Sequence, residues 1–187
     1  MYLKNIKGEV IFEGYFHTVK KAVEAAVRES VCLDGVDLRY ANLTHAKLDG
    51  AQMTGACLWG ANLRGANMSE ATLDRADCRN ADFKDCCLVD ANLTHSDFRG
   101  SYFSCTLLHN ADLSETKFSC PSIFQSKLHE AKRLDGAIFS HQGEFDCDLS
   151  RAPIVIHGTP KPVIILKDDI IIGDIIHGAS NRKAKQL

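Results

Sequence analysis

The stretch ANLRGANMSE, from Ala61 to Glu70, decides the fold, because it holds two copies of a five-residue pattern that fills the middle of the chain. Residues 31–130 divide into twenty consecutive groups of five without a gap. The third residue of a group is Leu, Met, Phe or Ile in nineteen of the twenty, and the exception is Cys78. The first residue is Ala or another small residue almost throughout. The other three are mostly polar, with many glycines at the fifth position.

A period of five fits neither an α-helix, which repeats every 3.6 residues, nor a free strand, which repeats every two. It requires a coil in which every fifth side chain returns to the axis. The first and third residues of a group lie two apart, so on a short extended segment they point to the same side, which becomes the interior. The fifth residue then lies in a turn, where glycine tolerates a positive φ. The pattern predicts an all-β solenoid with an apolar axis.

The groups ANLRG, ADLSE and ANLTH resemble the A(D/N)Lxx signature of the pentapeptide-repeat family. The resemblance implies a right-handed quadrilateral β-helix with four groups per coil, so that residue i stacks on residue i+20. Five coils at about 4.8 Å each give a rod of roughly 24 Å. One interior line is then expected to hold Leu43, Leu63, Phe83, Phe103 and Ile123.

The N-terminal segment, residues 1–30, is expected to cap the solenoid, because a terminal coil exposes backbone groups and core side chains. Short strands are predicted at residues 2–6 and 9–13. Thr18 is the expected N-cap of an amphipathic helix. One face of that helix carries Val19, Ala22, Val23, Ala26 and Val27.

The solenoid is expected to occupy residues 31–152, with the strict frame over 31–130 and a slip of one residue after it. Residues 153–187 are predicted to form a C-terminal β extension. Its expected strands cover 153–156, 163–166 and 170–172.

The whole layout is similar to a subset of pentapeptide-repeat proteins common in bacteriophage and prophage genomes. These have a VIFEG-like start, an AVEAAV-like helix, the repeat, and a PVxILxDxxxIG tail followed by His. The tail here reads KPVIILKDDIIIGDIIH, from Lys161 to His177. Asp174 stands where the subset has a Cys, which removes a thiol from this tail.

The net charge of −2 and the pI near 6.4 argue against a general nucleic-acid-binding protein, which needs a basic excess. We expect neither a signal peptide nor a membrane span, because charges interrupt the apolar runs. The eight cysteines include no CxxC pair, which favours free thiols in a reducing cytoplasm over a secreted disulfide protein.

The chain carries no GxSxG, HExxH, P-loop or GxGxxG motif, so it is not expected to be an enzyme or to hold a cofactor. No two cysteines of the repeat are twenty residues apart, and the stacked pair His109 and His129 has no acidic residue between its members in the same column. A metal site is therefore not expected either.

One outward face is the candidate binding site. The second of the four groups in each coil should lie on one side of the rod. The fourth residues of these groups should form a row, with about 4.8 Å between neighbours: Arg39, Trp59, Arg79, Arg99 and Ser119. The second residues of the same groups lie beside them: Asp37, Cys57, Asp77, Asp97 and Lys117.

Two interpretations of this face stay open. It is either a solvated ladder of Asp–Arg pairs, each worth less than about 1 kcal/mol, with Trp59 in cation–π contact with an arginine, or a surface for recognition. Trp and Arg are enriched in binding hot spots. The predicted partner-binding residues are Arg39, Tyr40, Trp59, Arg79 and Arg99. A second outward but apolar group, Cys87, Val89 and Leu107, is expected to lie under the C-terminal strands.

These patterns predict a non-catalytic protein-binding scaffold, and the resemblance implies a phage-type effector with an unidentified protein partner. Two alternatives remain. One is a DNA mimic that binds a type II topoisomerase, as the best understood members of the family do with DNA gyrase or topoisomerase IV. The other is a structural spacer. Residues 31–130 hold 13 acidic and 9 basic residues, a weak excess for a phosphate mimic. A homodimer through the C-terminal strands is a further expectation.

Overall fold

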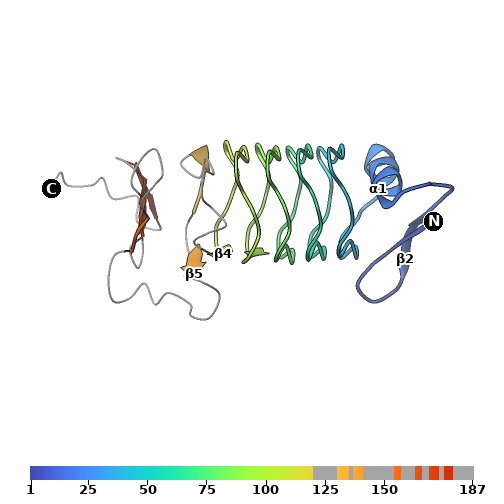
Figure 1. Cartoon of the computed structure of the whole chain (residues 1–187), viewed down its shortest axis with the longest axis horizontal. Coiled ribbons are helices and arrows are strands. Elements are labelled where there is room, and N and C mark those ends of the chain that lie inside the picture. Colours follow the sequence, from blue (N-terminus) through green and yellow to red (C-terminus); the bar gives the residue numbers. More distant parts are fainter. Residues whose placement is uncertain are drawn as a thin grey trace.

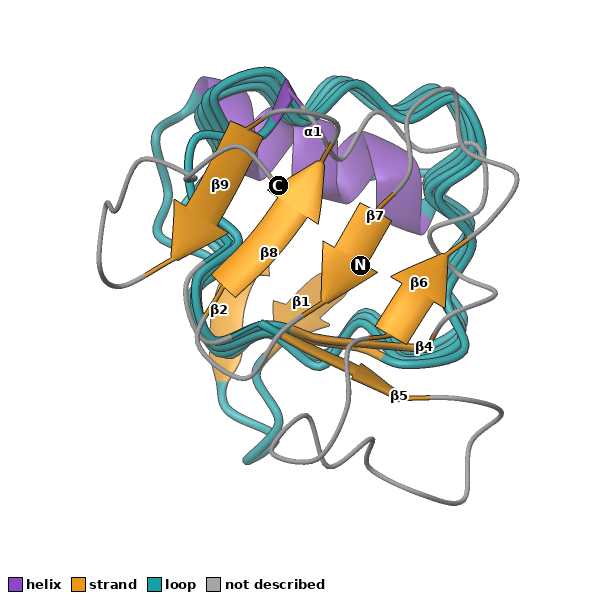
Figure 2. Cartoon of the chain, turned by 90° about the vertical axis from the view of Figure 1, so that its left-hand side faces the viewer, coloured by secondary structure: helices purple, strands orange, loops and turns teal. Residues whose placement is uncertain are grey.

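In a computed structural model of the chain, the repeat region forms a row of stacked coils, with a helix at its N-terminal end (Figure 1). The structure describes residues 1–119, 130–134, 137–140, 154–156, 163–165, 169–172 and 175–178. Viewed along the row, the outlines of successive coils lie almost on top of one another (Figure 2).

Each coil takes twenty residues. Parallel bridges join residues twenty apart throughout the stack, from Asp37 with Cys57 to Asn92 with Asp112. The predicted stacking of residue i on residue i+20 is therefore confirmed, and with it four groups of five per coil.

The group from Ala61 to Gly65 shows why the repeat folds in this way, since each of its five amides has a partner. The first donates to the carbonyl three residues back at 2.9 Å and the second to the preceding coil at 2.9 Å. The third and fifth donate to the following coil at 2.8 and 2.9 Å. The remaining amide, that of Arg64, donates to Oδ1 of Asn62 at 3.1 Å. Asn or Asp at the second position thus supplies an acceptor that the coils do not provide.

The fifth position of the group is a corner with left-handed backbone. From Gly35 to Glu115 the fifth residues all have positive φ, between 55° and 74°. Many of them are not glycine, and Tyr40 has a φ of 57°. Asn and Asp, which tolerate this region best after glycine, occur at several of the corners.

The first and third residues fill the interior. The third residues of the described groups, Leu43 and Leu63 among them, are fully or almost fully buried. Farther along, Phe83 and Phe103 stack with ring centroids 5.2 Å apart, as expected for residues on one interior line. Ile123, assigned to the same line, lies outside the described residues.

The N-terminal cap consists of strands β1 (Tyr2–Lys4) and β2 (Val10–Glu13), which pair antiparallel, and helix α1 (Val19–Arg28). The side chain of Thr18 caps the helix, as predicted, by accepting from the amide of Lys21. The strands are shorter than expected because Oδ1 of Asn5 accepts from two amides of the connecting turn. A bridge from Asn5 to Val36 joins the hairpin to the first coil.

The frame slip at the far end of the strict repeat is confirmed. Strands β3 (Asp97–Phe98), β4 (Lys117–Ser119) and β5 (Ile138–Ser140) form a parallel sheet in chain order. Partners between β3 and β4 are twenty residues apart, whereas Phe118 pairs with Phe139, twenty-one residues on.

Beyond the coils, strands β6 (Ile154–Ile156), β7 (Val163–Ile165), β8 (Asp169–Ile172) and β9 (Ile175–Gly178) form an antiparallel sheet in that order. The first three agree closely with the predicted strands. Sequence reasoning missed β9, although the dipeptide Gly-Asp between two isoleucine runs is a hairpin signal.

Candidate protein-binding face

The predicted row of outward side chains exists in the structure. Parallel bridges link Asp37, Cys57, Asp77 and Asp97 in successive coils, and this fixes the fourth residues of the same groups as a row beside them. We call the surface formed by residues 37–40, 57–60, 77–80 and 97–100 the Arg–Trp face. Of its candidate residues Arg39, Tyr40 and Arg79 are exposed, and Trp59 and Arg99 are half-buried.

Each arginine of the face is held by the aspartate two residues before it. Nε of Arg39 donates to Oδ1 of Asp37 at 2.8 Å and Nη2 to Oδ2 at 2.6 Å. The two bonds from Arg79 to Asp77 are both 2.8 Å long. Arg99 binds Asp97 in the same way, at 2.9 and 2.6 Å.

These bidentate pairs lower the pKa of two carboxyl groups. The hydrogen bond from Arg39 holds the pKa of Asp37 below its ordinary value, and the bond from Arg79 does the same for Asp77. Oδ1 of each aspartate also accepts the amide of its arginine, at 3.3 and 3.2 Å. Carboxylate, guanidinium and backbone therefore form one closed unit per coil, and the side chains are held in place.

The coil between the first two pairs carries Trp59 in place of the arginine. Trp59 meets Tyr40 edge-to-face, with ring centroids 4.7 Å apart and an interplanar angle of 85°. Cys57 stands where the other coils have aspartate. Tyr40 can lie across the next corner because that corner is Gly60, where a Cβ would come within 2.9 Å of the tyrosine ring.

A cation–π contact of Trp59 with an arginine stays a prediction. The ring contact that the structure gives Trp59 is the one with Tyr40. The neighbouring guanidinium groups are turned onto their own aspartates, where a charge-assisted bidentate bond outweighs an exposed cation–π contact.

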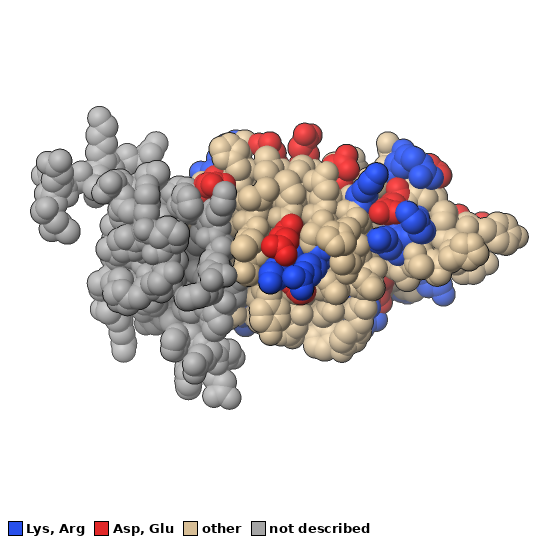
Figure 3. Space-filling view, turned by 45° about the horizontal axis from the view of Figure 1, so that its top comes forward, with Lys and Arg blue, Asp and Glu red and all other residues tan. Residues whose placement is uncertain are grey.

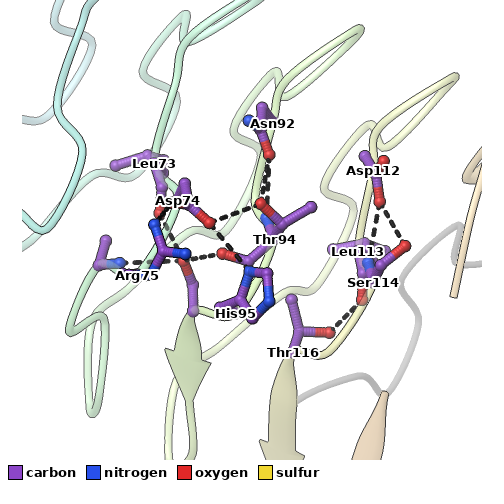
Figure 4. Close-up of polar contacts among 12 residues, drawn as sticks. Leu73, Asp74, Arg75, Asn92, Thr94, His95, Asp112, Leu113, Ser114 and Thr116 are labelled. Atoms are coloured by element: carbon purple, nitrogen blue, oxygen red, sulfur yellow. Dashed lines mark hydrogen bonds and ion pairs between the residues drawn. The ribbon is translucent and has the colours of Figure 1, made fainter. Parts of the chain in front are cut away.

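A second polar cluster, around Asp74, was not found from the sequence (Figure 4). The carboxylate of Asp74 accepts from Oγ1 of Thr94 at 2.7 Å and lies 3.0 Å from Nδ1 of His95, and it also pairs with Arg75. Burial raises the pKa of Asp74, but the hydrogen bonds from Thr94 and His95 leave it below its ordinary value. The sequence could have indicated the contact between Asp74 and Thr94, because residues twenty apart stack in neighbouring coils. The cluster ties neighbouring coils together.

The apolar group on another face is not covered as expected. Cys87 and Val89 are half-buried, but Leu107 keeps 39% of its surface exposed. The prediction that the C-terminal strands lie over this group is therefore wrong at Leu107. In Figure 1 these strands lie beyond β5, at the end of the coils.

The cysteines that the structure describes are free thiols: Cys32, Cys57, Cys78, Cys86, Cys87 and Cys105. Burial raises the pKa of Cys78 and of Cys86, so both are held in the unreactive thiol form. Within the described ranges no three His, Cys, Asp or Glu side chains are grouped so as to hold a metal ion.

Charge is unevenly distributed on the side of the molecule that Figure 3 shows. Lys and Arg side chains gather at the N-terminal end, over α1, whereas much of the coil surface carries no charge. A groove of about 450 Å³ lies here, lined by Lys21, Glu24, Val27, Arg28, Lys47 and Asp49. It mixes both signs of charge, and Glu24 is already paired with Lys21 at 2.8 Å.

Comparison with known proteins assigns the coils to a family. The family described as pentapeptide repeats matches in eight copies, over residues 32–69, 51–88, 61–100 and 86–119. Residues 32–119 are thus a pentapeptide-repeat region, and the right-handed β-helix is the fold that goes with this family. No curated protein matches the chain. No helix among the described residues is long and apolar enough to cross a bilayer.

Several solved structures are similar to parts of the chain. HetL, a pentapeptide repeat protein involved in heterocyst differentiation regulation in the cyanobacterium Nostoc sp., is 28% identical, with 57% of this chain and 52% of that chain covered and a TM-score of 0.27. A pentapeptide repeat protein of the Arabidopsis thaliana thylakoid lumen is 26% identical, with coverages of 46% and 66% and a TM-score of 0.21. QnrB1, a plasmid-mediated fluoroquinolone resistance protein, is 15% identical, with coverages of 56% and 57% and a TM-score of 0.32. The match spans less than two thirds of each of these proteins.

Proposed function

We propose that this chain is a non-catalytic binding protein that engages another protein through its Arg–Trp face. The observation that carries the proposal is that one face holds three clamped Asp–Arg pairs together with the Tyr40–Trp59 pair. Trp, Tyr and Arg are the residue types that dominate binding hot spots.

Pre-organisation supports this role. The side chains of Arg39 and Arg79 are bound through Nε and Nη2, so little rotamer freedom remains to be lost when a partner docks. Their Nη1 groups take no part in these bonds. The backbone beneath Arg79 is fixed by bonds to both neighbouring coils, and that beneath Arg39 by bonds to β1 and to the next coil. A partner therefore meets the guanidinium groups of Arg39 and Arg79 two coils apart, at a fixed spacing of about 9.6 Å.

The charge of the face favours a protein over a nucleic acid. Each arginine of the ladder is matched by an aspartate within hydrogen-bond distance, so the pairs add no net positive charge that could release counterions from phosphates. A protein groove of mixed or acidic character, with acceptors for the guanidinium groups and an apolar recess for Trp59, is the complementary surface.

The resemblance to phage and prophage proteins supports a more specific role as an effector that acts on a host or phage protein in the cytoplasm. The DNA-mimic alternative, with DNA gyrase or topoisomerase IV as partner, rests on the family resemblance. The small acidic excess of the repeat and the arginines on this face weigh against it. A structural spacer would leave the Arg–Trp face without a partner.

The test is capture of a partner from bacterial lysate by immobilised protein, followed by measurement of the affinity of the purified pair. We expect Trp59→Ala with Arg79→Ala to abolish capture while the coils stay folded, because both side chains lie on the outer surface. The matched control is Tyr102→Ala with Arg64→Ala, which removes one aromatic and one arginine from a neighbouring face. Both of these side chains are largely exposed.

Capture at full strength by the Trp59–Arg79 variant would place the binding site elsewhere. Inhibition of gyrase supercoiling by the unaltered protein at low micromolar concentration would establish the DNA-mimic alternative. Absence of any specific partner from lysates of both infected and uninfected cells would leave the spacer role.

A further inference from the structure

Strand β2 of the N-terminal hairpin presents an unpaired edge. Its neighbour β1 is paired with β2 on one side and joined to the first coil on the other, where the amide of Asp37 donates to the carbonyl of Lys4 at 2.8 Å. β2 has only β1 beside it among the described residues. Its sequence, VIFE, contains no Pro and one charged residue, Glu13.

The register of the hairpin shows which backbone groups face this edge. Met1 and Gly14 exchange both backbone bonds, at 2.6 and 3.1 Å, and two residues further in Leu3 lies opposite Phe12. The direction of backbone hydrogen bonding alternates along an antiparallel strand. The N–H and C=O groups of Glu13 and the C=O of Ile11 therefore point to the open edge, while the register shifts beyond Phe12, where Val10 lies opposite Lys4.

Exposed apolar side chains gather at the same end of the molecule. Large hydrophobic residues with more than a third of their surface exposed include five from the first fifteen residues: Met1, Tyr2, Ile6, Val10 and Tyr15. Tyr15 is fully exposed, and Val10 is 51% exposed. A contiguous exposed apolar surface on a protein commonly marks an interaction site.

We propose that β2 pairs antiparallel with β2 of a second copy of this chain, so that two N-terminal hairpins join into one four-stranded sheet. A two-stranded hairpin is only marginally stable alone, whereas three or more strands with an apolar face are stable. The twofold axis makes the contact self-limiting, because each copy uses the same edge and none is left for a third.

Charge selects the register of this pairing. If Ile11 lay opposite its own symmetry mate, Glu9 of each copy would face Glu13 of the other. If Glu13 lay opposite its symmetry mate, two carboxylates would face each other on the axis. Like charges directly opposite are destabilising. Centring the axis on Phe12 avoids both: Ile11 then lies opposite Glu13 of the second copy, and the N–H of Glu13 donates to the C=O of Ile11 across the axis in both directions.

The same register gives the exposed side chains a partner. With Phe12 on the axis, Tyr15 lies opposite Glu9 of the second copy. The Arg–Trp face lies on the coils and takes no part in this contact.

The experiment is sedimentation velocity of the full chain from micromolar to submillimolar concentration. We expect a monomer–dimer equilibrium that Glu13→Pro abolishes. The substitution removes one edge donor, and the preceding residue is already extended, as a residue before proline must be. The matched control, Glu13→Ala, keeps the N–H and should dimerise like the unaltered protein. Far-UV circular dichroism checks that the cap stays folded.

A second variant guards against damage to the hairpin. Tyr15→Glu alters a fully exposed side chain, so it cannot unpack the monomer, but it places a carboxylate opposite Glu9 of the second copy. Because the axis repeats the repulsion, we expect dimerisation to weaken about tenfold. A chain that stays monomeric throughout, or a dimer unaffected by both Glu13→Pro and Tyr15→Glu, overturns the proposal. The second result would point to another surface, such as the C-terminal strands.

Discussion

The first and second halves of the coil stack fill the same backbone in different ways. Up to Leu73 the interior is built from Leu or Met at the third position and Ala or Val at the first. From Phe83 onward the third position often carries Phe, and the first position often carries Ser or Thr. Both halves keep the same spacing of hydrogen bonds between coils.

The aromatic half replaces aliphatic packing with ring stacking. Phe98 stacks on Phe118 with ring centroids 5.4 Å apart. This pair meets the stacked pair of Phe83 and Phe103 edge-to-face, and the centroids of Phe98 and Phe103 are 5.1 Å apart. Aromatic pairs in such geometry contribute about 0.5–1.5 kcal/mol beyond their buried area.

Buried hydroxyls accompany the rings without being left unsatisfied. Oγ1 of Thr106 donates to the carbonyl of Phe83 at 2.7 Å, and Oγ1 of Thr116 donates to Leu113 at 2.6 Å. Both side chains are fully buried. The comparison teaches that the first position requires small volume rather than an apolar surface, because the backbone of the coil supplies an acceptor.

The largest expected effect is on the stacked rings. Phe83→Ala should lower the free energy of unfolding by about 3–5 kcal/mol, because flanking coils bonded above and below cannot close the cavity. Leu63→Ala, one coil earlier on the same interior line, should cost less, since it removes less volume and no ring contact. Urea unfolding followed by circular dichroism measures both. An equal or larger cost for Leu63→Ala would mean that the rings add nothing to packing.

A smaller effect is expected from the buried hydroxyl. Thr106→Val keeps the shape of the side chain but removes the bond to the Phe83 carbonyl, which retains a second donor in the amide of Cys86 at 3.0 Å. We expect a loss of about 1 kcal/mol in the free energy of unfolding. Thr106→Ser keeps the hydroxyl and serves as the control for the bond. A Val variant as stable as the unaltered protein would show that the aromatic half accepts hydroxyls without gaining from them.

The smallest effect concerns the Asp–Arg pairs, which occur in both halves. Arg79 lowers the pKa of Asp77 below its ordinary value of 3.8, so the pair stabilises the fold above about pH 4 and this contribution is lost as the pH falls through the lowered pKa. Asp77→Asn should reduce stability by less than about 1 kcal/mol at neutral pH, with no difference well below pH 4. Unfolding measured across this pH range checks the convergence. A constant difference at every pH would assign the loss to packing instead of charge.

The repeat itself made most of the coil region predictable. Large apolar side chains every five residues fix which backbone positions face the axis, and the one-residue slip appears in the sequence as a shifted Ala-x-x-Leu spacing at Ala131 and Leu134. The row containing Arg39, Trp59 and Arg79 follows from the same arithmetic. These features depend on backbone periodicity, which one sequence records completely.

Side-chain partners on the surface were less predictable. Whether Trp59 would meet an arginine or Tyr40 depends on a competition of small energies, decided by the aspartate within each group and by the glycine at the next corner. The Asp74 cluster crosses from one coil to the next, and strand β9 is too short to show a period. The sequence pattern does not identify the proposed partner, because recognition would depend on a surface that belongs to another molecule.

The coil-to-coil bonding has a mechanical consequence. Among the described residues, each coil is bonded to the coils immediately before and after it, through amides that reach residues about twenty positions away, and the first coil is also bonded to β1. A force applied to the two ends of the chain would therefore act on one terminal coil at a time. Each release would lengthen the chain by about 65 Å, the extended length of twenty residues less one coil spacing. Under tension the coils should unfold one after another from the ends of the stack, and the aromatic coils should unfold at higher force than the aliphatic ones.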